Sequence, residues 1–235
     1  MTCTGAWPAD LPGAGWPARA GPDDNAAMPQ HPLSEAPPSP GAAGPSLTGL
    51  WISGISHPAR AMRALPGAGG PSLGLRTVLT RFLVTDLIET LPQALLGRRP
   101  FTPTSLPIPP QHHYRAQLVF LPAFGVGAWL LMGGTAHGLL RLSGYDADLR
   151  RVLDVVGVGM LIPMPPLWAA DALMLATDTF RLPGPAITHA VVQLWETALF
   201  AVGLQTVLGM PWVPAVLAGV AASGLYVLLG SKLVR

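Results

Sequence analysis

One carboxylate lies far inside an apolar stretch of the sequence. Glu196 is the only formally charged residue between positions 182 and 231. A carboxylate at such a depth in a membrane is costly, and it is by default a functional candidate. Glu196 would relay protons, coordinate a cation or pair with a basic group on another helix. The alternative is a structural role, in which Glu196 is hydrogen-bonded inside a helix bundle, with Gln193 or Gln205 near it along the chain.

A second set of polar residues follows helical spacing. Asp86, Glu89, Thr90 and Gln93 fall at i, i+3, i+4 and i+7, so one face of a helix would carry all four. If this helix enters the membrane, the stripe should face the bundle interior, toward Glu196. Asp86, Glu89 and Glu196 would then form an ion or proton site. On the membrane surface, the stripe would instead be a solvated or packing face.

Three prolines interrupt another apolar segment, in the sequence "LIPMPPLWAAD" at 161–171. Proline removes a backbone donor and clashes with the carbonyl four residues earlier. Because Pro165 precedes Pro166, its backbone is also pushed away from helical geometry. We therefore expect a helix over 151–162, a break at Pro163, Pro165 and Pro166, and a second helix from 166. The freed carbonyls would either belong to a packed kink or line a binding site, as in broken transporter helices.

No sequence pattern is typical of an enzyme or of a metal site. Neither a G-x-S-x-G elbow nor a P-loop occurs. His112 and His113 are adjacent, while His137 and His189 fall near the ends of apolar segments, so their spacing does not converge on an ion. Hydrogen bonding near the membrane surface is the interpretation we favour for them. We predict no catalytic, cofactor-binding or metal-ligating residue and no enzymatic activity.

Small residues form two ridges at helical spacing. Gly134 and Gly138 make a GxxxG pattern, and Ala215, Gly219 and Ser223 make a second small-x-x-x-small pattern. Such ridges let membrane helices approach closely. The contact would lie within one bundle or between subunits, so a homo-oligomer or another membrane protein is an expected partner.

The composition sets the class of protein. Of 235 residues, 50% are hydrophobic and only 11% are charged, against about 25% charged residues in soluble domains. The lipid bilayer is therefore the predicted partner, and a net charge of +2 gives no reason to expect nucleic acid. Residues 1–49 are rich in Pro, Gly and Ala without periodicity, which predicts a disordered tail.

The remaining chain divides into membrane segments. Residues 50–72 predict an amphipathic pre-membrane segment, either an interfacial helix or a packed connector. A helical membrane domain then follows over 73–235. Its apolar segments lie at about 116–141, 151–176, 187–208 and 212–231, and a more polar first segment lies at about 75–97. The predicted fold is an all-α bundle of about five transmembrane helices, the first marginal and the third broken at Pro163–Pro166.

The number of spans is open between four and five. The cost of burying Asp86 and Glu89 roughly offsets the gain from the apolar residues of segment 75–97. Five spans would also distribute the basic loop residues evenly between the two sides. The positive-inside rule therefore favours four spans.

Three stretches together resemble a known family. They are "AWLLMGGTAHGLLRLSGYDADLRRVLDVVGVGMLIPM" at 128–164, "SHPARAMRAL" at 56–65 and "LWETALFAVGLQTVLGMPWVPAVLAGV" at 194–220. Over about 50–235 the chain resembles bacterial members of the Yip-one domain family (Ypt/Rab-interacting proteins). The positions that carry the resemblance in the first stretch are His137, Arg141, Gly144, Leu149, Arg151, Gly157 and Pro163.

The resemblance implies a five-helix membrane bundle with a cytoplasmic N-terminus, in the bacterial inner membrane. Eukaryotic relatives take part in vesicle trafficking with prenylated small GTPases, but their N-terminal signature is not seen here. For this chain the resemblance implies a non-enzymatic membrane scaffold, or a trafficking or organisation factor, acting through lipid and protein contacts. The alternative is a small transporter or channel component that uses intramembrane carboxylates.

Overall fold

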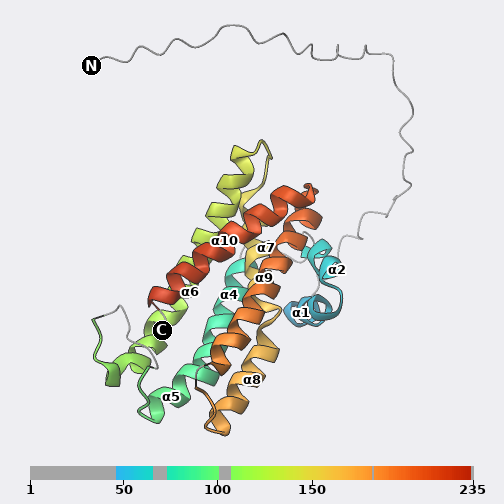
Figure 1. The fold of residues 1–235 in the computed structure, drawn as a ribbon. Helices are drawn as coiled ribbons and strands as arrows, with labels where there is room; N and C mark the ends of the chain where they lie inside the picture. The colour runs from blue at the N-terminus through green and yellow to red at the C-terminus, as the bar shows by residue number, and fades with distance from the viewer. Residues whose placement is uncertain (1–45, 66–72, 101–106, 182, 234–235) are drawn as a thin grey trace, which may run out of the picture. The chain divides into compact units, whose positions relative to one another are not determined.

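The computed structural model describes residues 46–65, 73–100, 107–181 and 183–233. Within these ranges every regular element is helical (Figure 1). The predicted tail at 1–49 lies almost wholly outside the described residues, as does the end of the predicted segment 50–72. The elements are α1 (Leu47–Ser56), α2 (Pro58–Arg63), α4 (Leu73–Thr85), η1 (Asp86–Thr90), α5 (Leu91–Leu95), η2 (Pro110–His112), α6 (His113–Leu142), α7 (Leu149–Leu161), α8 (Met164–Ala176), α9 (Gly184–Leu208) and α10 (Trp212–Leu233).

Four helical stretches are long and apolar enough to cross a membrane. They are Pro110–Leu142, Leu149–Ala176, Gly184–Leu208 and Trp212–Ser231. Their outward faces carry large apolar side chains, such as Val119, Leu173 and Leu194, which are 80%, 65% and 73% exposed. Such faces suit lipid rather than water. The chain is thus a multi-pass integral membrane protein, and its four apolar segments lie where the sequence predicts them.

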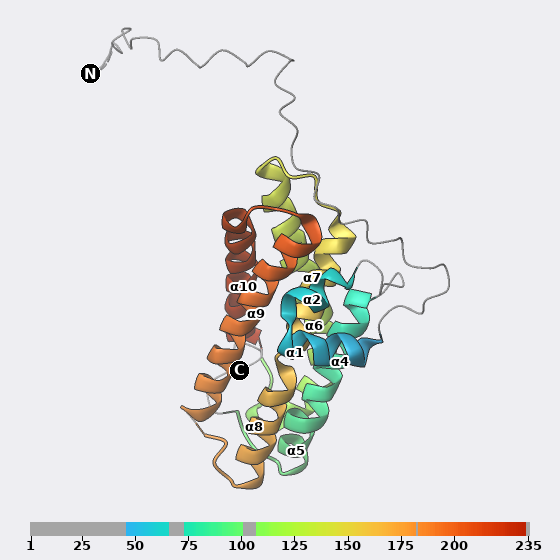
Figure 2. The ribbon, with the colours of Figure 1, turned by 90° about the vertical axis from the view of Figure 1, so that its right-hand side faces the viewer.

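The helix formed by α4, η1 and α5 has its polar side turned inward. Its first part, α4, lies beside α7, while η1 contacts α8 and α6 and α5 contacts α6 (Figures 1 and 2). Its outer side presents leucines, with Leu87 63% and Leu95 78% exposed. This arrangement is the reverse of an amphipathic helix on a water-soluble protein. The buried polar residues of this helix are Thr77, Arg81, Asp86, Glu89, Thr90 and Gln93.

A wide turn divides this helix in the middle of the polar stripe. In η1, a π-helical turn, the Leu91 N–H donates to the carbonyl of Asp86, five residues earlier. The turn lies just before Pro92, whose missing N–H leaves the carbonyl of Ile88 without its usual helical donor. Single π turns of this kind absorb such local strain and occur often at functional sites.

The third span is broken at its prolines. The helix α7 ends at Leu161 and α8 begins at Met164, with Pro163 in the N-cap position. The second helix therefore begins two residues earlier than the predicted 166. Pro165 and Pro166 lie within the first turn of α8, where backbone N–H groups have no helical acceptor, so they do not obstruct it.

Side chains from two other helices satisfy carbonyls at the break. Trp51 Nε1 of α1 donates a 3.2 Å hydrogen bond to the Ile162 carbonyl, which Pro166 deprives of its helical donor. Arg81 of α4 donates a 2.9 Å hydrogen bond from Nη1 to the Met160 carbonyl. The break is therefore a packed part of the bundle, and it draws α1 and α4 onto α7.

Paired glycines allow α4 and α7 to approach closely. A Cβ added at Gly157 would lie 2.7 Å from the Gly74 carbonyl and from Thr77 Oγ1. A Cβ at Gly74 would lie 2.8 Å from the Leu153 carbonyl. Only glycine fits on either side of this contact, which therefore fixes where α4 crosses α7.

The two predicted small-residue ridges have different surroundings. Ala215, Gly219 and Ser223 are buried, and a Cβ on Gly219 would contact the backbone of α9 at 3.4 Å. A Cβ on Gly134 or Gly138 would meet no atom within 4 Å among the described residues. The first ridge therefore packs α10 onto α9, and the second is open on the surface of α6.

The pre-membrane segment packs onto this bundle as two short helices. The chain turns at His57, because Pro58 begins α2. Leu50 and Met62 are buried at 2% and 0% exposure, while Ile52 and Ile55 stay exposed. The segment is therefore a connector with a packed side, and its remaining apolar residues face outward.

Candidate functional site

An ion pair lies at the centre of the bundle. Arg81 Nη1 of α4 lies 2.6 Å from Glu196 Oε1 of α9. Both side chains are buried, with 7% and 0% of their surface exposed. The basic group across the helices that the sequence analysis considered for Glu196 is therefore Arg81. The two opposite charges compensate each other where solvent cannot.

The guanidinium of Arg81 has further partners on two other helices. Besides its bond to Met160 on α7, its Nη2 donates a 3.4 Å hydrogen bond to the hydroxyl of Tyr226 on α10. The guanidinium carbon also lies 5.5 Å from the centre of the Tyr226 ring and 5.3 Å from that of Phe82, within the range of cation–π attraction. We call Arg81, Glu196, Tyr226 and the Met160 carbonyl the paired centre. It ties four helices together.

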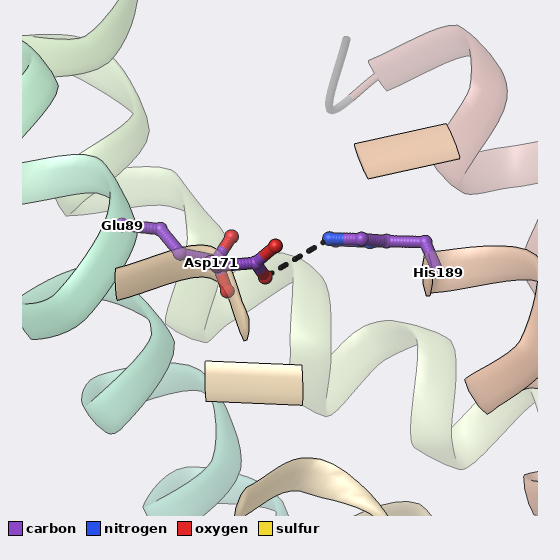
Figure 3. A group of neighbouring side chains, drawn as sticks. All are labelled: Glu89, Asp171 and His189. Carbon is purple, nitrogen blue, oxygen red and sulfur yellow. Dashed lines mark hydrogen bonds and ion pairs between the residues drawn. The ribbon is translucent and has the colours of Figure 1, made fainter. Parts of the chain in front are cut away.

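A second group of ionisable residues lies between η1, α8 and α9. One ligand atom each of Glu89, Asp171 and His189 lies within 4.8 Å of the other two. Figure 3 shows the carboxyl groups of Glu89 and Asp171 next to each other, with the imidazole of His189 directed toward Asp171. His189 Nε2 lies 3.2 Å from Asp171 Oδ2. We call these three residues the acidic cluster.

The acidic cluster lacks the compensation that the paired centre has. Asp171 is fully buried, and its Oδ1 has no hydrogen-bond partner among the described residues. Glu89 is 8% exposed, and its Oε1 is likewise without a partner in the described part of the chain. Two carboxylates at this distance repel each other, and low-dielectric surroundings strengthen the repulsion. The cluster therefore requires a positive species, a proton or a metal ion, to balance its charge.

The cluster lies near one end of the bundle. Asp178, in the turn after α8, pairs with Arg98 at 2.6 Å and with Arg181 at 3.0 Å, and Asp178 and Arg181 are largely exposed. His189 lies five residues into α9, about 7 Å along the helix axis. Its side chain is 47% exposed, whereas that of Asp171 is not exposed at all. The histidine therefore lies on the accessible side of the cluster, and the buried carboxylates lie behind it.

Two of the three predicted polar site residues belong to these groups, one to each. Glu196 belongs to the paired centre, and Glu89 belongs to the acidic cluster. Asp86 is buried at 6% exposure on the same helix as Glu89, one turn earlier. Arg81 and Glu89 lie on the same helix, eight residues apart, so the two groups follow one another along it. None of the described contacts joins Asp86, Glu89 and Glu196 in one site.

Other contacts hold the helices around the cluster. Trp168 Nε1 of α8 donates a 2.9 Å hydrogen bond to Thr85 Oγ1 of α4, just before the π turn. Gln93 Nε2 donates at 3.2 Å to the Glu89 carbonyl. The first bond holds α8 against the helix that carries Glu89, and the second lies within that helix, next to Glu89.

The sequence did not identify Arg81, Tyr226, Asp171 or His189 as site residues. Arg81 lies five residues before Asp86, and Asp171 lies near the end of an apolar segment, so each resembles an ordinary flanking charge. His189 was interpreted as an interfacial hydrogen-bonding residue. One local signal was available, because His189 and Glu196 are seven residues apart and share a helix face.

The protein was compared with known protein families, with curated proteins and with solved structures, and none of these comparisons gave a match.

Proposed function

We propose that the protein is a small membrane transporter, or a transporter component, that moves a cation through its polar interior. The observation that carries this proposal is Asp171, a fully buried carboxylate with an unpartnered oxygen beside a second buried carboxylate. Ionisable residues inside a membrane domain typically mark ion or proton pathways. An unbalanced pair of carboxylates favours a bound cation more directly than a neutral ion pair does.

The order of the polar groups supports a pathway. His189 is half-exposed near the end of the bundle that carries Arg98, Asp178 and Arg181. Asp171 and Glu89 lie behind it. The paired centre follows deeper in the bundle, where Arg81 and Glu196 compensate each other and leave no net negative charge to hold a cation. A cation that enters past His189 would thus be held at the two carboxylates.

In the transport proposal, the helix formed by α4, η1 and α5 also lies within the membrane. The polar residues of this helix face the bundle and its leucines face outward, as expected for a helix surrounded by lipid on one side. We propose that it is a fifth membrane helix, in which Arg81, Asp86 and Glu89 are tolerated because they lie inside the bundle, while Arg76 is exposed near its N-terminal end. Its insertion would depend on the neighbouring helices more than on its own hydropathy.

A membrane-organising role of the Yip-one kind is a second proposal. The open ridge of Gly134 and Gly138 on α6 supports it, since such ridges let a helix of another membrane protein approach. This role does not require the carboxylates of the acidic cluster. The two proposals therefore differ in what they expect of Asp171.

The test is flux through the full-length protein in liposomes. Proton flux is followed with a trapped pH-sensitive dye under an imposed potassium diffusion potential, and metal flux with a trapped metal-sensitive dye. We expect flux with the wild-type protein and a loss of at least about tenfold for Asp171→Asn, which removes the binding charge. Asp146→Asn, an exposed position in the loop between α6 and α7, is the matched control and should conduct normally. If liposomes with the wild-type protein, with Asp171→Asn or with Asp146→Asn all show the same flux as protein-free liposomes, the transport proposal is overturned.

A further inference from the structure

We propose that Glu89, Asp171 and His189 bind one divalent transition-metal ion, such as Zn²⁺, Mn²⁺ or Fe²⁺. This inference rests on the proposed function, because it names the class of cation that the transporter carries. The three residues come from η1, α8 and α9, so the site exists only in the folded bundle (Figure 3).

The spacing of the ligand atoms suits a single ion. The ligand atoms lie within 4.8 Å of one another, so an ion at their centre lies at most about 2.8 Å from each. Zinc ligands bind at about 2.0–2.2 Å, so each side chain must move inward by at most about 0.7 Å. Small rotations about the side-chain bonds provide that movement. The backbone therefore already places three ligands around one point.

The charge of the site favours a divalent ion. Glu89 and Asp171 together supply two negative charges, and His189 binds as a neutral ligand. A divalent ion would leave the occupied site neutral, which is the least costly state inside a membrane. A monovalent ion would leave one negative charge. Arg81, the cation nearest to Glu89 along the chain, is already paired with the carboxylate of Glu196.

The ligand types favour a transition metal. Carboxylate oxygens alone would suit Mg²⁺ or Ca²⁺, but an imidazole ligand is characteristic of Zn²⁺, Fe²⁺ and similar ions. Two carboxylates and one imidazole give three protein ligands and leave a position for water. The half-exposed side of His189 is where that water would enter. Three protein ligands and an open position also suit an ion that must leave again.

The unpartnered oxygens give an independent reason to expect a ligand. Asp171 Oδ1 is completely buried and has no donor among the described residues, and the same holds for Glu89 Oε1. Buried polar atoms in folded proteins are almost always satisfied, and an orphaned one calls for a bound species. A metal ion between the two carboxyl groups would satisfy both oxygens at once.

The experiment uses Co²⁺ as a spectroscopic probe for the full-length protein in detergent. Co²⁺ bound at this site should give visible d–d absorption bands, which Zn²⁺ should remove by competition and Mg²⁺ should not. Asp171→Asn should weaken binding by about 100-fold or more, and His189→Gln should weaken it by about 10-fold or more and change the band positions. His137→Gln, a histidine of α6 outside the cluster, is the matched control. His189→Gln also guards against misfolding, because its side chain is half-exposed.

The outcomes separate this inference from the transport proposal. Absence of Co²⁺ bands in the wild type, or unchanged bands in Asp171→Asn and His189→Gln, would overturn the metal site. If the metal site fails while proton flux depends on Asp171, transport stands and the cation is a proton. If Co²⁺ binds as expected but no ion crosses the liposome membrane, the site stands and the transport proposal fails.

Discussion

Two groups of buried charges lie in the same bundle and differ in how their charge is balanced. In the paired centre, Arg81 and Glu196 are 2.6 Å apart, and Arg81 also donates to a backbone carbonyl and to a hydroxyl. In the acidic cluster, Glu89 and Asp171 face each other and only His189 offers a donor among the described residues. In the paired centre each charge has an opposite charge in contact with it, whereas the described residues give the two carboxylates of the acidic cluster no such partner apart from His189.

From this difference we expect the paired centre to contribute to the stability of the fold and the acidic cluster to contribute to ligand binding. Breaking a complete buried ion pair leaves an uncompensated charge, which is strongly destabilising. Removing one of two facing carboxylates relieves repulsion and costs little. Charge alone therefore does not identify a functional residue in a membrane bundle. The balance of charge around each residue is the better indicator.

The largest expected effect follows from breaking the paired centre. Glu196→Gln leaves Arg81 charged and unpaired inside the bundle, and it should lower the free energy of unfolding by about 3–5 kcal/mol. Denaturant unfolding of the full-length protein in mild detergent measures this loss. The double variant Arg81→Met with Glu196→Gln removes both charges and should recover part of the stability. A Glu196→Gln protein as stable as the wild type would show that the ion pair contributes nothing.

A smaller effect is expected at the helix contact that brings Arg81 to its partners. Gly157→Ala would place a Cβ 2.7 Å from the Gly74 carbonyl, so α4 must move away from α7. We expect a loss of about 1–3 kcal/mol, measured in the same unfolding experiment. Gly134→Ala on the open surface of α6 is the matched control and should not destabilise the protein. Equal results for the two variants would contradict the close contact of α4 with α7.

The smallest effect on stability is expected in the acidic cluster. Asp171→Asn keeps the shape of the side chain and a partner for His189, and it removes one of two facing charges. In metal-free buffer its free energy of unfolding should fall by less than about 1 kcal/mol or should rise. If Asp171→Asn lowers the free energy of unfolding as much as Glu196→Gln does, both groups stabilise the fold. The proposed difference between the paired centre and the acidic cluster would then be wrong.

Features that depend on local sequence were predictable. The four apolar segments follow from hydropathy over about 20 residues, and the structure has apolar helices at those positions. The break at Pro163–Pro166 follows from the chemistry of proline itself, and only its C-terminal edge differed by two residues. Both predictions use information that lies within one helix.

Features that depend on contacts between helices were not predictable in the same way. Arg81 and Glu196 are more than a hundred positions apart, and the ligand atoms of the acidic cluster come from three elements. A search for metal ligands by spacing examines one helix at a time, so it passes over His189. The glycine contact between Gly74 and Gly157 is hidden for the same reason, because each glycine looks ordinary within its own helix.

The break in the third span has a mechanical consequence. The half before it, α7, buries eight of its thirteen residues, whereas α8 buries only Met164, Leu167 and Asp171. Asp171 lies seven residues from the start of α8, about 10 Å along the helix axis, so any tilt of α8 at the break would move Asp171 over a lever arm of that length. Tilting α8 by about 10° would displace Asp171 by about 2 Å, as much as the length of a metal–oxygen bond. The carbonyl of Met160, on the anchored side of the break, would stay with Arg81.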